Sequence, residues 1–142
     1  MKETSIKQEL KEGKTVIYYT MGISMEPLLK ARRTHVVLTP VSKPQKYDIL
    51  LYERQDGKYV LHRLLNIKND FFYIRGDNTF YLEKIHPSQI IGKVSRVYRN
   101  GRYIDVEKSF IYKVYVLVNI WSYPLRFFRY KLKKLRARKQ RG

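Results

Sequence analysis

The stretch that decides the fold is residues 48–75, which read DILLYERQDGKYVLHRLLNIKNDFFYIR. It contains three runs rich in branched aliphatic and aromatic residues, a composition typical of β-strands. These runs cover 48–54, 58–68 and 71–75. The joints between them, at 55–58 and 69–70, have the Asp-Gly and Asn-Asp chemistry of hairpin turns. The stretch therefore predicts a β-meander of neighbouring antiparallel strands.

Strand-like composition continues on both sides of the meander. Further runs lie at 15–20, 35–41, 90–99 and 103–106. The last two runs are separated by Asn100-Gly101, the strongest short hairpin signal. Residues 1–106 are therefore predicted to form one small, mainly β domain.

The chain changes character at Glu107, after which no glycine occurs until the last residue. The long aliphatic and aromatic run that follows predicts a helical segment from about Lys108 to Lys139, within a second region at 107–142. Pro124 is expected to kink or divide this helix, because proline removes a helical hydrogen bond.

Positive charge is concentrated in this second region. The formal net charge of the chain is +18, and residues 126–142 hold nine basic and no acidic residues. The uncharged run 114–125 is shorter than the roughly 20 residues that span a bilayer. Two interpretations remain open: the helix packs on the β-domain, or residues 110–142 bind an anionic membrane surface, which the adjacent basic residues favour.

Composition also limits the chemistry and the location. There is no cysteine, and His35, His62 and His86 have no metal-ligand spacing, so neither a metal nor another cofactor is expected. Residues 1–14 are polar and charged, unlike a signal peptide or an N-terminal anchor. The expected location is therefore the cytoplasmic face of a membrane.

One turn has the features of a nucleophile site. Ser24 lies in Met21-Gly22-Ile23-Ser24-Met25-Glu26-Pro27, directly after the first predicted strand. Gly22 permits a sharp turn, and Pro27 stiffens its exit. Such a turn presents the serine hydroxyl and its own backbone N–H at one point, but a serine also needs a neighbouring base.

His62 and Asp77 are the candidate partners of this serine. His62 lies within a meander strand, and Asp77 follows the next strand in Arg75-Gly76-Asp77-Asn78. Because the two strands are neighbours, Asp77 is expected to orient the imidazole. The ordinary alternatives are a histidine that serves packing and an aspartate that bonds its own backbone in a turn.

Four segments in the same order resemble the sequence boxes of type I signal peptidases and their LexA-like relatives. The nucleophile box is similar to 22–28, the following strand to 48–52, the base box to 60–64 and the Gly-Asp-Asn box to 75–78. Histidine in the base box is characteristic of the endoplasmic-reticulum, archaeal and Gram-positive members, whereas others have lysine.

The resemblance implies a small, mostly β signal-peptidase core and a serine endopeptidase that cleaves a leader or pro-segment from a peptide or protein. Ser24 would attack the scissile carbonyl, His62 would be the general base and Asp77 would support it. Gly22, Met25, Pro27, Gly76 and Asn78 would complete the site, and Glu83 stands where relatives often have a second aspartate.

The alternative is a catalytically silent domain of the same fold that holds nucleic acid or an anionic membrane through its basic surface. Nucleic acid is the weaker choice, because no helix-turn-helix or zinc-finger pattern occurs.

Overall fold

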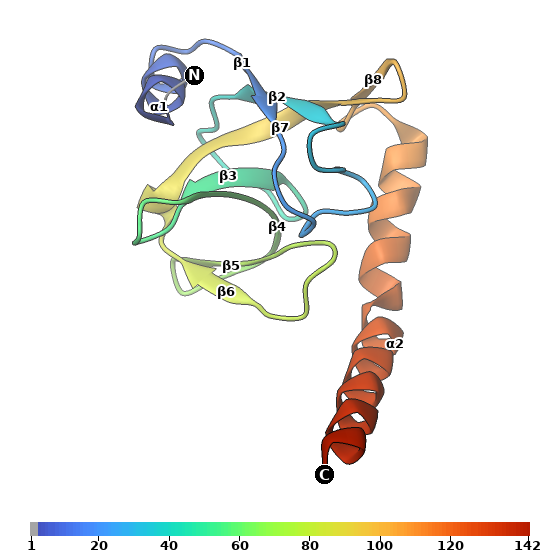
Figure 1. Cartoon of the computed structure of the whole chain (residues 1–142). Helices are drawn as coiled ribbons and strands as arrows, with labels where there is room; N and C mark the ends of the chain where they lie inside the picture. The colour runs from blue at the N-terminus through green and yellow to red at the C-terminus, as the bar shows by residue number, and fades with distance from the viewer. Residues whose placement is uncertain (1–2) are drawn as a thin grey trace. The chain divides into compact units, whose positions relative to one another are not determined.

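The computed structural model describes residues 3–142 and consists mainly of an antiparallel β-sheet with one long C-terminal helix (Figure 1). The chain divides into two compact units, and the boundary lies between Ser109 and Phe110. The predicted fold class, mainly β with a C-terminal helix, is thereby confirmed.

Eight strands form one antiparallel sheet. They are β1 (Val16–Tyr19), β2 (His35–Thr39), β3 (Ile49–Glu53), β4 (Tyr59–Lys68), β5 (Phe71–Arg75), β6 (Glu83–Ile85), β7 (Ile90–Arg99) and β8 (Arg102–Asp105). The order is β1-β2-β7-β3-β4-β5-β6, and β8 pairs with β7. Irregular pairing interrupts the register between β2 and β7, β3 and β7, and β4 and β5, and such bulges let the sheet curve (Figure 1).

Two predicted hairpin turns are confirmed. Asn69 and Asp70, between β4 and β5, have φ angles of 52° and 64°. Asn100 and Gly101, between β7 and β8, have φ angles of 51° and 77°. Paired positive φ angles are the geometry that gives two-residue hairpins the twist of their strands.

Part of the hydrophobic core lies around the meander. One cluster of buried side chains joins β3, β4, β5 and β6 and comprises Leu50, Tyr52, Leu64, Phe72, Ile74 and Ile85. Burial of a large apolar side chain stabilises a fold by about 1.5–3 kcal/mol. This cluster therefore helps to fix β4, which carries His62, and β5, which leads to Asp77.

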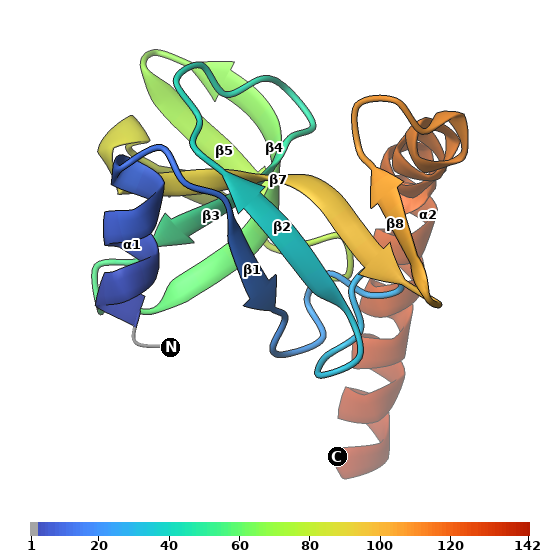
Figure 2. The ribbon, with the colours of Figure 1, turned by 90° about the horizontal axis from the view of Figure 1, so that it is seen from above.

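An N-terminal helix, α1 (Glu3–Lys11), was not expected from the polar composition of this segment. Its apolar residues Ile6 and Leu10 are one turn apart, and both are buried. The Leu10 side chain would lie 3.0 Å from a Cβ atom at Gly92 of β7, so this glycine permits close packing. Helix α1 contacts β1 and β7 (Figure 2).

The C-terminal unit is a single helix, α2 (Phe110–Arg141), which continues through Pro124. Of the two expected outcomes at this proline, a kink or a division, the division is wrong. Two side chains on either side of the proline form hydrogen bonds to the backbone of the preceding turn. Ser122 Oγ and Arg126 Nη2 both donate to the Asn119 carbonyl, at 3.2 and 2.7 Å.

A short 3-10 helix, η1 (Pro87–Gln89), precedes β7. Within residues 3–142, no helix combines the length and the apolar character needed to cross a membrane.

Candidate functional site

Ser24 lies in the connection between β1 and β2, at the start of a turn over 24–28. Gly22 has a φ of 77°, a conformation that side-chain-bearing residues rarely adopt. Met25 and Leu28 are buried and anchor the turn, whereas Ser24 stays partly exposed. Pro27 follows a cis peptide bond and is exposed. The turn thus presents the serine at the surface of a fixed loop.

The Gly-Asp-Asn turn packs directly against this loop. The backbone N–H of Asn78 donates to the Ser24 carbonyl at 2.8 Å, and the Asn78 side chain donates to the Ile23 carbonyl at 3.1 Å. The backbone N–H of Asp77 points to Met25 Sδ at 3.3 Å. Two segments about fifty residues apart in the chain therefore hold each other in place.

Gly76 lies between the candidate nucleophile loop and the candidate base. A Cβ atom at this position would lie 2.5 Å from the Ser24 carbonyl oxygen and 3.1 Å from His62 Nε2. Real Cβ atoms do not approach backbone so closely, so glycine is required here. The same distances show that the Nε2 edge of His62 faces the Ser24 loop across Gly76.

Ser24 and His62 also line the same pocket, which has a volume of about 240 Å³. His62 is 1% exposed, and the ring of Tyr81 lies edge-on at 6.3 Å from its own. Among the described residues, no hydrogen bond joins the Ser24 hydroxyl to the imidazole. Such catalytic contacts often form only in the substrate complex.

Two strand edges border the pocket. Strand β1 is at the end of the sheet order, and Tyr18 lines the pocket. Residues 59–62 of β4 also line the pocket. This part of β4 pairs with β3 on one side, but its pairing with β5 on the other side begins only at Arg63. The pocket thus lies between residues of β1 and residues of β4.

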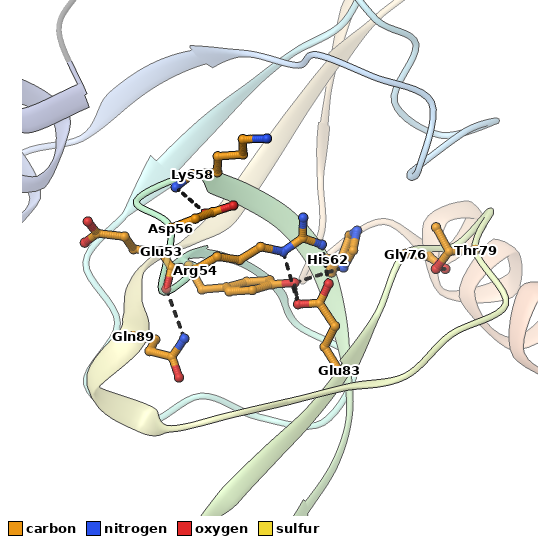
Figure 3. Close-up of polar contacts among 10 residues, drawn as sticks. Glu53, Arg54, Asp56, Lys58, His62, Gly76, Thr79, Glu83 and Gln89 are labelled. Atoms are coloured by element: carbon orange, nitrogen blue, oxygen red, sulfur yellow. Dashed lines mark hydrogen bonds and ion pairs between the residues drawn. The ribbon is translucent and has the colours of Figure 1, made fainter.

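The other ring nitrogen of His62 faces a chain of polar groups (Figure 3). Its Nδ1 lies 3.1 Å from the hydroxyl of Tyr52, and this hydroxyl donates to Glu83 Oε2 at 2.5 Å. Arg54 donates to both oxygens of Glu83, with Nε at 3.3 Å from Oε2 and Nη2 on Oε1. Glu83 is thus connected to His62 through Tyr52.

Burial determines the protonation of this group. Burial lowers the pKa of His62 to about 4. The negative charges of Glu83 and Asp77 oppose this shift, and the positive charge of Arg54 adds to it. Burial also raises the pKa of the Tyr52 hydroxyl far above its ordinary value. Burial alone would raise the pKa of Glu83, but hydrogen bonds from Arg54 and Tyr52 lower it. At neutral pH, His62 and Tyr52 are neutral and Glu83 is ionised.

The expected hydrogen bond between Asp77 and His62 is wrong. Asp77 instead binds Arg63, whose Nε and Nη2 donate to the two carboxylate oxygens at 2.7 and 2.8 Å. Both side chains are almost fully buried, and Arg63 also donates to the Tyr47 carbonyl at 2.9 Å. A guanidinium offers a carboxylate two charge-assisted bonds, which a neutral imidazole cannot match.

Tyr52 is the residue that sequence reasoning missed. In the β3–β4 register, Leu50 is opposite His62 and Tyr52 is opposite Val60. Tyr52 is therefore a diagonal neighbour of His62 on the same face, within reach of a long side chain. Once the β3–β4 hairpin is predicted, this spacing is the signal that identifies it.

The part of the chain that the structure describes contains no group of three histidine, aspartate or glutamate side chains placed to hold a metal ion. In comparisons with known proteins, no protein-family model matches the sequence, and no curated protein matches it significantly.

Proposed function

We propose that this chain is a serine endopeptidase of the signal-peptidase type, which cleaves a leader or pro-segment from a peptide or protein. The main supporting observation is that Ser24 and the neutral, buried His62 line one pocket. A neutral imidazole can accept the serine proton, and the order of the sequence boxes provides independent support.

In this mechanism, Ser24 Oγ forms a bond to the scissile carbonyl carbon while His62 Nε2 accepts the hydroxyl proton. The peptide C–N bond then breaks, and His62 returns the proton to the leaving amine. Water, deprotonated by the same imidazole, hydrolyses the acyl-enzyme and regenerates Ser24. The backbone N–H of Ser24, at the start of the turn, is the candidate donor to the oxyanion.

The pocket favours small side chains in an extended substrate. Its walls include Thr20, Leu29 and Leu61, and its volume of about 240 Å³ must hold both backbone and side chains of the peptide. Pairing of the peptide with the edges of β1 and β4 would supply affinity through main-chain hydrogen bonds. We therefore expect small residues immediately before the cleaved bond.

Cleavage of a diverse peptide library, read by mass spectrometry, tests this function. The wild type is expected to produce cuts after small residues, and Ser24→Ala to produce none, because the nucleophile is absent. Ser42→Ala, at an exposed serine of the β2–β3 loop, is the matched control and should cleave like the wild type. Absence of cuts with the wild type in detergent and liposomes would contradict the proposal and favour the silent binding domain.

A second proposed property is binding of α2 to an anionic membrane surface. Exposed apolar residues recur along the whole helix at alternating spacings of three and four. They are Ile111, Val114, Val118, Trp121, Leu125, Phe128, Leu132 and Leu135. Ten basic and no acidic residues lie between 110 and 142. An apolar stripe with tryptophan and phenylalanine beside a basic face is typical of helices that lie in the membrane interface.

Vesicle flotation tests this surface. The full-length protein is expected to float with vesicles that contain anionic lipid and to float less with neutral vesicles or at high salt. Trp121→Ser combined with Phe128→Ser should weaken flotation, whereas Ile67→Ser, at an exposed apolar residue of β4, should not. Equal flotation of all three proteins would show that the stripe does not bind the membrane.

A further inference from the structure

We propose that Glu83 positions the catalytic His62 through the hydroxyl of Tyr52, so that a carboxylate-tyrosine relay performs the orienting role that a direct aspartate contact was expected to perform. This inference rests on the proposed function, in which His62 is the general base. It assigns to Tyr52 and Glu83 a positioning role, and to Arg54 the role of holding Glu83.

The relay follows from counting donors and acceptors. Arg54 has donors only and binds both oxygens of Glu83, so the carboxylate is ionised and can only accept. The single hydroxyl proton of Tyr52 is therefore directed to Glu83, in agreement with the short distance of 2.5 Å. The Tyr52 oxygen is left with lone pairs facing His62 Nδ1, 3.1 Å away.

This bond fixes the tautomer of the imidazole. A neutral histidine carries one ring proton, and an acceptor at Nδ1 places the proton on that nitrogen. Nε2 then keeps its lone pair, and Nε2 is the atom that faces Gly76 and the Ser24 loop. The basic nitrogen thus lies on the side of the Ser24 loop, and a basic nitrogen held near the serine is what orientation of a histidine by a carboxylate achieves in serine peptidases.

The relay is rigid because the sheet holds its three members. Tyr52, on β3, is fully buried, and His62, on β4, is 1% exposed. Glu83, on β6, is opposite Ile74 of β5, so the β5–β6 pairing fixes its backbone. Tyr52 and His62 have ring centroids 5.9 Å apart. A relay built on paired strands holds the imidazole more precisely than a mobile loop would.

The relay also suits a base that must remain neutral. A carboxylate in contact with the imidazole strongly favours the protonated ring, whereas one acting through a tyrosine has a weaker effect. The charged and titratable groups around the ring are Glu83, Arg54, Asp77, Tyr52 and Tyr81. Burial outweighs the charges of Glu83 and Asp77, and with Arg54 it keeps the pKa of the imidazole low enough for the ring to be unprotonated at neutral pH.

The test is nitrogen NMR of the His62 ring in the full-length protein, combined with kinetics on a cleaved peptide. The wild type is expected to show a proton on Nδ1 and none on Nε2. Tyr52→Phe keeps the aromatic ring but removes the acceptor, so the proton should move toward Nε2. The same variant should lower kcat by at least about 10-fold, with little change in KM.

Two further variants complete the experiment. Glu83→Gln should also shift the tautomer, because the Gln amide can donate to Tyr52, and the Tyr52 hydroxyl would then donate to His62 Nδ1. This variant replaces Tyr52→Phe in the experiment if Tyr52→Phe fails to fold. Tyr73→Phe, on β5, is the control and should leave both readouts unchanged. An unchanged tautomer in both relay variants would overturn the inference.

The NMR readout does not require cleavage. Failure of the proposed function would appear as the absence of Ser24-dependent cuts, whereas failure of the relay would appear as an Nδ1 proton that persists without Tyr52.

Discussion

The His62→Ala variant is expected to cleave a peptide substrate at least about 10³-fold more slowly than the wild type. Without the imidazole, the serine loses the base that the mechanism requires, and Glu83 does not replace it, because Tyr52 lies between them and keeps its own proton. The measurement is kcat/KM on a substrate found with the peptide library.

The strongest evidence for a joint site would be non-additivity. Residues that act as one unit lose nearly all activity when either is removed, so Ser24→Ala, His62→Ala and the double variant should fall to the same residual rate. His86→Asn, at an exposed histidine next to η1, should keep full activity. Losses that multiply in the double variant would contradict a shared role.

The fold was largely predictable because its strongest signals are local. The turns Asn69-Asp70 and Asn100-Gly101 define two hairpins by themselves, and the strands around them follow from composition. Strand β6 was missed because Glu83–Ile85 is only three residues long and its strand conformation comes from pairing with β5. Helix α1 was missed because its segment is mostly polar.

The candidate site contains residues that the sequence named, but most of the contacts among them could not be predicted. The loop of Ser24 and the turn around Gly76, both named from the sequence, lie in contact. The partner of Asp77 could not be predicted, because His62 and Arg63 are consecutive on β4 and point to opposite faces. Only the structure shows that the carboxylate lies on the Arg63 side.

The contact between Tyr52 and Glu83, unlike the one between Tyr52 and His62, was also outside the reach of sequence reasoning. It depends on Tyr52, 31 residues before Glu83, and on the pairing that places β6 beside β5. No periodicity in the chain encodes a contact between β3 and β6.

Breaking the buried pair of Arg63 and Asp77 is expected to cost about 3–5 kcal/mol of unfolding free energy. Their side chains are 1% and 2% exposed, so Asp77→Asn leaves a guanidinium charge uncompensated, and Arg63→Met leaves a carboxylate uncompensated. Urea unfolding of each variant against the wild type measures this loss. Lys7→Met, which removes a partly exposed ion pair with Glu53, is the control and should have a far smaller effect.

The double variant Arg63→Met with Asp77→Leu separates a structural from a catalytic role for Asp77. Because both charges are removed together, the double variant should have a higher unfolding free energy than a single variant that leaves one charge unpaired. The losses of the two single variants should therefore not add. If Asp77 serves the fold, the refolded double variant should also retain measurable cleavage, since His62 is still held by Tyr52. A stable Asp77→Asn protein that has lost cleavage would instead assign the carboxylate to catalysis. The outcome decides whether the Gly-Asp-Asn turn acts on the imidazole or mainly locks the end of β5 against the Ser24 loop.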